Sequence, residues 1–297
     1  MIHNPTAGDE AYGRESLVTI LADAGHDVVY RSINDDGWQE ALREDTELVV
    51  AAGGDGTVRK VFKELAGSST PVTLFPVGSA NNIARTLGFE HDSAAVLVRG
   101  WKNGRKRPYD LGRVESTLFE ERFVESIGAG VFAEVLIRAE GRDKPADGDE
   151  KVELGLRLLR EVVEEAPSHP FGLELDGLAF TADLLAIEAM NVRETGPNVP
   201  LAPDADPGDG LLDLVLIGEQ DRAELVAYLD ARLEGGTPKT PRLEVQRGVR
   251  LSIQPPEGCP LRADDQVLAE DARRDEIGAA AASADAGRLF VLVPGAR

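Results

Sequence analysis

An uninterrupted apolar run at residues 48–52 leads directly into a segment with three glycines, Gly53, Gly54 and Gly56. An unbroken apolar run of this length is typical of a parallel strand that helices cover on both faces. Glycines at the carboxyl end of such a strand permit positive φ angles and close backbone approach, so that successive N–H groups can converge on a phosphate. A helix that begins next adds favourable partial charge at its amino terminus. The pattern therefore predicts an α/β domain with a phosphate site at one edge of its sheet.

Asp55 is the unusual residue of this segment, because its carboxylate would repel a bound phosphate. Two unit charges about 4 Å apart interact by roughly 4 kcal/mol at an effective dielectric constant of about 20. A magnesium ion with its waters would offset this repulsion. Alternatively, Asp55 caps the helix that follows and the loop binds no ligand. Both interpretations are open at this point.

Helical and extended patterns alternate from residue 14 to residue 88. Helices are expected at residues 15–24, 37–44, 58–65 and 82–87, and strands at residues 28–32, 48–52 and 72–77. This rhythm predicts a doubly wound parallel sheet. Only three residues precede a turn at Asn4 and Pro5, so the first strand is either short or begins upstream of Met1.

The pattern changes near residue 104, where extended runs follow one another with few helices between them. These runs cover residues 107–114, 119–127, 171–175, 184–190, 211–217, 243–245, 249–253 and 289–293. Helices are expected at residues 131–139, 151–165 and 222–233, and a polar loop at residues 141–150. A mostly antiparallel second domain follows from this pattern. We therefore divide the chain into an α/β domain at residues 1–103 and a β-rich domain at residues 104–297, whose last segment can return to the first domain.

The chain carries 53 acidic and 32 basic residues, a formal net charge of −21. This charge repels nucleic acids and anionic membranes, which excludes a nucleic-acid partner and allows at most transient contact with a membrane surface. The acidic residues are scattered along the chain, as expected for a halophilic protein whose self-repulsion is screened by salt. The single cysteine, Cys259, cannot form an internal disulfide, and no stretch resembles a signal peptide or a membrane span. A cytoplasmic location is expected.

Three segments of the first domain share a recognisable pattern: NPTAG at residues 4–8, GGDGT at residues 53–57 and PVGSANNIAR at residues 76–85. In this order and spacing they resemble the diacylglycerol kinase catalytic-domain family, whose bacterial lipid kinases are related to sphingosine kinase and NAD kinase. Residues 203–213, PDADPGDGLLD, are similar to that family's PxAxxxDGxLD segment. The resemblance thus covers nearly the whole chain. It implies an α/β domain like that of NAD kinase and phosphofructokinase, followed by the β-rich domain.

The resemblance implies that the first domain binds ATP, with Mg²⁺ beside its phosphates. Ser79 stands where relatives carry a threonine whose hydroxyl meets a phosphate or its magnesium shell. The residues that match the family's nucleotide site are Asn4, Pro5, Thr6, Ala7, Gly8, Ser32, Gly53, Gly54, Asp55, Gly56, Thr57, Val58, Arg59, Gly78, Ser79, Asn81 and Asn82. Asp55 is also expected to take part in catalysis.

A structural magnesium site is implied in the second domain. Asp209 matches the family's metal-binding aspartate, and the backbone carbonyls of Asp206 and Leu211 help to complete the set. Such an all-oxygen set suits a hard cation. Alternatively, residues 206–210 merely form a solvent-exposed turn before a strand.

The family also carries an Asp-Gly-Glu triplet near the end of the chain, and the matching residues here are Asp264, Asp265 and Gln266. A carboxylate near the acceptor hydroxyl helps to remove its proton during phosphoryl transfer. Asp264 is therefore the candidate general base, with Asp265 as the alternative. A third interpretation is that this stretch is simply exposed on the surface and has no catalytic role. An amide is a poor base, so Gln266 departs from the pattern, as does Asn82, where relatives carry an aspartate.

Together these features predict an ATP-dependent lipid kinase that phosphorylates the hydroxyl of a diacylglycerol-like lipid alcohol. The alternatives are an NAD kinase-like enzyme, because NAD kinases share the glycine loop, and a non-catalytic regulator that binds nucleotide or lipid, because two family carboxylates are replaced by amides. Diacylglycerol, an ether-linked analogue, a sphingoid base and an isoprenoid alcohol are all candidate acceptors, because each presents a hydroxyl beside apolar chains. The resemblance is compatible with a homodimer.

Overall fold

The apolar run before the glycines forms β3 (Val49–Gly53) inside a six-stranded sheet in the computed structural model of the chain, and all of β3 is buried. The other strands of this sheet are β1 (Ile2–His3), β2 (Arg31–Ser32), β4 (Val72–Pro76), β5 (Arg105–Asp110) and β19 (Arg288–Val293). Their order is β2-β1-β3-β4-β19-β5, and every neighbouring pair is parallel except β19 with β5. The predicted parallel sheet is confirmed.

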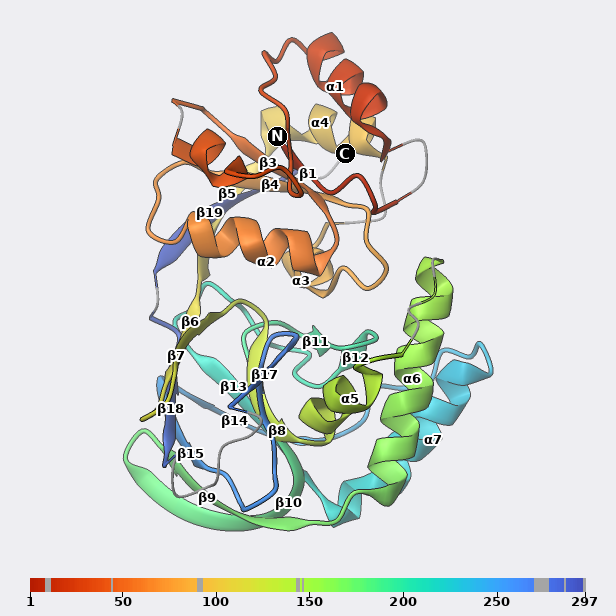
Figure 1. The fold of residues 1–297 in the computed structure, drawn as a ribbon, viewed down its shortest axis with the longest axis vertical. Helices are drawn as coiled ribbons and strands as arrows, with labels where there is room; N and C mark the ends of the chain where they lie inside the picture. The colour runs from red at the N-terminus through yellow and green to blue at the C-terminus, as the bar shows by residue number, and fades with distance from the viewer. Residues whose placement is uncertain are drawn as a thin grey trace. The chain divides into compact units, whose positions relative to one another are not determined.

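Helices cover both faces of this sheet, as Figure 1 shows. On one face lie α1 (Arg14–Asp23) and α4 (Ala94–Gly100), and on the other lie α2 (Asp55–Glu64) and α3 (Asn82–Leu87). Helix α2 is amphipathic, and its Val58, Val61 and Phe62 are buried. An apolar stripe of this kind is what holds a helix against a sheet.

Several elements differ from the expectation. The helix expected at residues 58–65 begins at Asp55, because Gly54 is extended and serves as its N-cap. The strand expected at residues 28–32 is confined to β2, and the segment at residues 37–44 forms a 3₁₀-helix, Trp38–Arg43. Helix α4 was not predicted, and a further 3₁₀-helix, Trp101–Asn103, follows it.

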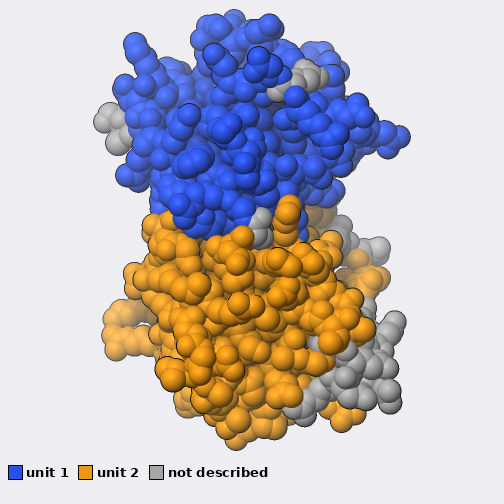
Figure 2. Space-filling view, turned by 90° about the vertical axis from the view of Figure 1, so that its left-hand side faces the viewer, with its two compact units in different colours: residues 1–111, 287–297 blue, residues 112–286 orange. Residues whose placement is uncertain are grey.

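The structure describes residues 1–8, 12–43, 45–89, 93–142, 145, 147–269, 278–285 and 287–295. The chain divides into two units, which Figure 2 colours separately. Unit 1 consists of residues 1–111 and 287–297, and unit 2 consists of residues 112–286. The last strand, β19, therefore belongs to the first sheet. The expected domain boundary between residues 103 and 104 stays a prediction.

Unit 2 is built on an eleven-stranded sheet whose described neighbours are all antiparallel. Its strands are β6 (Gly112–Glu115), β7 (Glu120–Phe123), β8 (Ser126–Gly130), β9 (His169–Leu175), β10 (Leu178–Met190), β13 (Leu212–Gly218), β14 (Glu244–Gly248), β15 (Arg250–Gln254), β16 (Leu261–Ala263), β17 (Gln266–Leu268) and β18 (Ala280–Ser283). The order is β17-β16-β8-β10-β9-β15-β18-β6-β7, with β13 joining β10 to β14. A separate pair is formed by β11 (Glu194–Thr195) and β12 (Val199–Pro200). The predicted antiparallel sheet is confirmed.

In unit 2, α6 (Gly148–Glu165) packs against both α5 (Val131–Ala139) and α7 (Arg222–Leu233), and a 3₁₀-turn, Glu219–Asp221, precedes α7. Helix α6 begins within the expected polar loop, because Asp147 Oδ1 accepts hydrogen bonds from the backbone N–H groups of Asp149 and Glu150. Such an N-cap satisfies donors that a helix start otherwise leaves unpaired. Among the described residues, no helix has both the length and the hydropathy needed to cross a membrane.

Cys259 provides a test of the unit 2 core, because its side chain is buried among apolar residues. Burial, together with the charge of Glu134, raises the pKa of the Cys259 thiol to about 12. At about pH 8 the reactive thiolate is then on the order of one molecule in 10⁴. We expect a disulfide reagent to leave Cys259 unmodified in the folded protein and to react fully after denaturation in guanidinium chloride. Rapid labelling of the folded protein would contradict the burial of Cys259.

Candidate functional site

Four neighbouring parallel strands, β2, β1, β3 and β4, end at the same edge of the unit 1 sheet. The residues that match the family's nucleotide site, from Asn4 to Asn82, all lie at the last positions of these strands or in the segments that follow them. A backbone hydrogen bond from Asn4 N–H to the Ala52 carbonyl (2.9 Å) joins the first two of them. In open α/β sheets this edge is where ligands bind.

The loop after β3 and the turn after β4 are in very close contact. Val77 N–H donates to the Gly53 carbonyl (3.2 Å). A Cβ atom on Gly78 would lie 2.2 Å from the Cα of Gly54, so only glycine fits there. Asn81, at a left-handed φ of 55°, closes this turn: its amide accepts a hydrogen bond from Gly78 N–H (3.1 Å) and donates one to the Gly78 carbonyl (2.7 Å). The Asn81 side chain therefore shapes the turn.

Asp55 caps a helix other than its own. Its Oδ2 accepts a hydrogen bond from Asn82 N–H (3.0 Å), and its Oδ1 accepts one from Ile83 N–H (3.1 Å), both in the first turn of α3. Burial raises the pKa of the Asp55 carboxyl, whereas these N–H donors and Arg59 act in the opposite direction. The positive end of α3 thus offsets the carboxylate charge. Neither sequence-based interpretation included this contact, and a catalytic role for Asp55 stays a prediction.

The first turn is built on Asn4, whose Oδ1 accepts hydrogen bonds from the N–H and the hydroxyl of Thr6 (3.1 and 2.8 Å). Gly8 ends the turn at a φ of 81°, and a Cβ there would lie 3.1 Å from the Cβ of Val77. The first turn therefore also packs against the turn after β4. Ser32 Oγ accepts a hydrogen bond from Asn34 N–H (3.1 Å).

The remaining side chains of this edge differ in exposure. Ser79 is exposed, and its hydroxyl can reach a ligand in solvent. Thr57 is buried, and its side chain packs onto the backbone of Gly53. The backbone N–H groups at the start of α2 and the Ser79 hydroxyl therefore form the part of the edge best suited to an anion.

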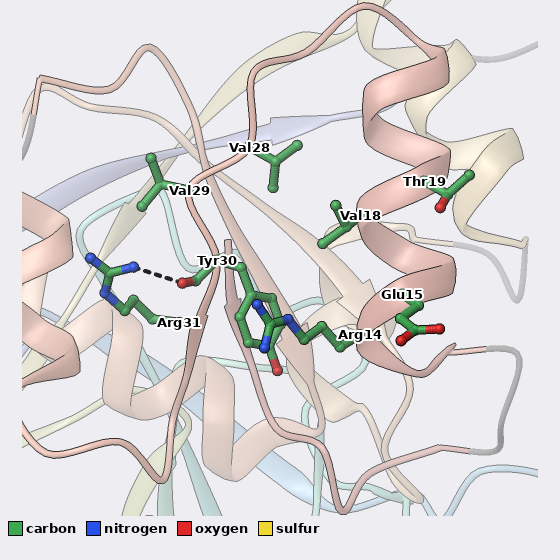
Figure 3. A pocket seen from close by; sticks show the side chains of 8 residues that line it. All are labelled: Arg14, Glu15, Val18, Thr19, Val28, Val29, Tyr30 and Arg31. Carbon is green, nitrogen blue, oxygen red and sulfur yellow. Dashed lines mark hydrogen bonds between the residues drawn. The ribbon is translucent and has the colours of Figure 1, made fainter.

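A groove of about 610 Å³ lies between α1 and the segment that leads into β2 (Figure 3). The Arg14 guanidinium lies over the Tyr30 ring, 4.5 Å from its centroid, and Arg31 donates a hydrogen bond to the Tyr30 carbonyl (2.9 Å). The Tyr30 hydroxyl is 3.1 Å from Nδ1 of His3, the residue before Asn4. The side chains of Tyr30 and His3 therefore connect the groove to the first turn.

The expected magnesium residues of unit 2 form a turn. Asp206 Oδ1 accepts a hydrogen bond from Gly208 N–H (3.0 Å), and Asp209 Oδ1 accepts one from Leu211 N–H (2.9 Å). The Arg247 guanidinium contacts the other oxygen of Asp209, where a cation would bind. Among the described residues, no group of three or more His, Cys, Asp and Glu side chains could hold a metal ion. Because two of the three predicted ligands are backbone carbonyl oxygens rather than side chains, the set of Asp206, Asp209 and Leu211 stays a prediction.

The candidate base lies in the tight turn between β16 and β17. Asp264 has a φ of 54° and is buried, and its Oδ1 accepts hydrogen bonds from the N–H groups of Val124 (2.9 Å) and Glu125 (2.8 Å). Asp265 and Gln266 are exposed. A carboxylate oxygen offers two lone-pair positions, so Oδ1 of Asp264 is fully engaged. Asp264 therefore anchors the turn, and Asp265 is the residue of the turn whose carboxylate is exposed to solvent.

A buried ion pair beside this turn was missed from the sequence. Arg262 on β16 and Glu188 on β10 are 4% and 0% exposed, and their closest atoms, Nη2 and Oε2, are 2.6 Å apart. Burial raises the pKa of the Glu188 carboxyl, and the charge and hydrogen bonds of Arg262 oppose that rise. A single glutamate inside the apolar run at residues 184–190 was the available signal.

Comparison with known proteins gives consistent matches for both units. The model of the diacylglycerol kinase catalytic domain matches residues 1–114, and that of the YegS C-terminal NAD kinase beta sandwich-like domain matches residues 125–282. The diacylglycerol kinase of Bacillus subtilis is 26% identical over 90% of this chain and 88% of its own length. The Pseudomonas aeruginosa protein named "Probable lipid kinase YegS-like" is 30% identical over 88% of this chain and 89% of its own. A solved diacylglycerol kinase structure from Bacillus anthracis has the same fold, with a TM-score of 0.71 and 17% identity over 98% of this chain and 95% of that one.

Substitution of Gly78 tests the close contact of the two turns. In Gly78→Ala the new methyl meets the backbone of Gly54, which cannot move aside as a side chain would. We expect a lower thermal unfolding midpoint and a loss of roughly 1–3 kcal/mol in the free energy of unfolding. Gly56→Ala is the matched control, because its methyl meets only the Arg59 side chain at 3.6 Å and alanine favours the helix. An equal loss in both variants would contradict the close approach.

Proposed function

Since this chain belongs to the diacylglycerol kinase catalytic-domain family, we propose that it transfers the γ-phosphoryl group of ATP to the hydroxyl of a diacylglycerol-like lipid. The observation that carries the proposal is the convergence of three turns at one edge of the unit 1 sheet, where Gly54 and Gly78 approach closely. A sheet edge suited to phosphates and membership of a lipid kinase family both favour phosphoryl transfer to an alcohol.

Unit 1 would bind the nucleotide through the start of α2. The loop from Gly53 to Thr57 presents backbone N–H groups and the positive helix end to the phosphates, and Ser79 adds an exposed hydroxyl. ATP would bind as its magnesium complex, with Ser79 beside the phosphates or the magnesium shell, and the ion would neutralise phosphate charge. Asp55 would act mainly by holding α3 against this loop, since both of its oxygens are engaged there.

Unit 2 would supply the carboxylate that accepts the proton of the lipid hydroxyl. We assign this role to Asp265, because it is exposed whereas Asp264 is buried and holds the turn. The sequence favours Asp264 as the base, whereas the burial of Asp264 favours Asp265. Gln266 cannot take the role, because a neutral amide does not accept a proton at working pH.

The reaction can be tested with γ-labelled ATP, magnesium and vesicles that contain diacylglycerol, at high potassium chloride. Wild type should form a labelled lipid. Asp265→Asn should lower kcat by about 10²–10⁴-fold, the usual contribution of a general base, with little change in the KM for ATP. Asp264→Asn keeps an acceptor oxygen for Val124 and Glu125 and should lose less activity.

The other outcomes separate the rival functions. An active Asp265→Asn variant beside an inactive, folded Asp264→Asn variant would show that Asp264 is the base. Labelled NADP from added NAD, without labelled lipid, would identify an NAD kinase-like enzyme. Saturable ATP binding with neither product would identify a non-catalytic regulator.

The net charge of −21 supports a salt-rich cytoplasm as the working environment, with at most transient membrane contact. Self-repulsion among acidic groups weakens as the Debye length falls from about 10 Å at 0.1 M to about 3 Å at 1 M salt. We expect the thermal unfolding midpoint to rise over this range of potassium chloride. Sodium chloride should act similarly, and an uncharged osmolyte at equal osmolarity should not reproduce the full increase. A midpoint that is independent of salt would contradict this proposal.

A further inference from the structure

Arg262 is a buried cation with an unusually complete set of partners. Its guanidinium nitrogens lie within hydrogen-bond distance of five oxygens: both carboxylate oxygens of Glu188 (3.1 and 2.6 Å), the hydroxyls of Ser126 (3.0 Å) and Thr195 (2.9 Å), and the backbone carbonyl of Asp264 (2.6 Å). These partners come from β10, β8, β11 and the turn after β16. The planar fork of arginine fixes all these directions at once, which the ammonium of a lysine would not do.

Stability alone does not account for this ion pair. Both charges lose their water when they are buried, and apolar side chains of similar volume often give equal or greater stability. The surrounding sheet nevertheless makes room for the pair, because a Cβ on Gly128 would lie 2.2 Å from Cδ of Glu188. The Phe132 ring lies on the guanidinium, with its centroid 5.7 Å from Cζ of Arg262. Unlike apolar side chains, the pair forms hydrogen bonds, and these bonds fix the orientation of the neighbouring groups.

The neighbour it holds is the peptide group between Asp264 and Asp265. Arg262 Nη1 donates to the carbonyl of that peptide. The same turn is held by Asp264 N–H, which donates to the Ser126 carbonyl (2.8 Å), and by Asp264 Oδ1 through Val124 and Glu125. The orientation of this peptide sets the direction in which the Asp265 side chain leaves the backbone.

We propose that Arg262, held in place by Glu188, is the positioning residue that orients the Asp265 carboxylate toward the acceptor hydroxyl. The inference rests on the proposed function, because it assumes that Asp265 receives the proton. A buried arginine so close to a carboxylate turn would otherwise be a costly substitute for an apolar side chain. The role is indirect, since the guanidinium is buried and touches the turn only through the Asp264 carbonyl.

The decisive variant replaces the whole pair, Glu188→Leu together with Arg262→Met. Arg262→Met alone would leave Glu188 buried and unpaired, and that protein is expected to fold poorly. The double variant should keep a wild-type unfolding midpoint and a wild-type KM for ATP, while kcat falls by about 10- to 100-fold because the base is displaced. The amide hydrogens of Val124 and Glu125 should exchange faster, since the turn that accepts them is no longer held.

Arg222→Met is the matched control. Arg222 also spans backbone carbonyls in unit 2, with hydrogen bonds to Glu164 (3.0 Å) and Ala166 (2.7 Å) at the end of α6. Its loss should lower stability without changing kcat or the exchange of Val124 and Glu125.

Wild-type kcat and unchanged amide exchange in the folded double variant would overturn the inference. If wild type transfers no phosphate, the proposed function fails. In that case the Val124 and Glu125 exchange rates alone decide whether Arg262 holds the turn.

Discussion

The candidate nucleotide edge depends on one contact, the approach of the backbone at Gly78 to the backbone at Gly54. No side chain fits between them, so the loop after β3 and the turn after β4 act as a single surface. Asp55 adds a second link between these segments, because it belongs to the loop after β3 and caps α3, the helix that follows the turn after β4. A change that separates the two segments therefore also removes a helix cap, and the first turn, which packs on Val77 through Gly8, loses its support.

Unit 2 fixes the turn that carries Asp265 by a different physical means. In unit 1 the geometry is set by the absence of side chains, whereas in unit 2 it is set by charged side chains removed from water. A buried arginine that donates in fixed directions can position the short turn that joins the paired strands β16 and β17. Asp264 contributes the second anchor, because its Oδ1 accepts two backbone N–H groups on the strand-to-strand connection before β8.

Much of this fold is readable from the sequence, because apolar runs and glycines report burial and turns directly. The parallel sheet, α3 at residues 82–87 and α5 at residues 131–139 agree with the expectation. Helix α4 was missed because its few residues show no clear period, and the Asp55 cap because its partners are 27 and 28 residues away. The Glu188–Arg262 pair joins residues 74 apart in sequence. Local patterns carry no information about such contacts.

The amides at positions 82 and 266 have different consequences for chemistry. Asn82 meets Asp55 through its backbone N–H, so an amide side chain leaves that cap unchanged. Gln266, by contrast, removes a carboxylate from an exposed position, and Asp265 restores the charge one residue earlier, where the family pattern has glycine. Adjacent residues of a tight turn point their side chains in different directions. The carboxylate of Asp265 can therefore accept the proton of the lipid hydroxyl only if the peptide group between Asp264 and Asp265 is oriented to direct it there. The hydrogen bond from Arg262 to the Asp264 carbonyl acts on that peptide, which links the departure from the family pattern to the buried ion pair beside it.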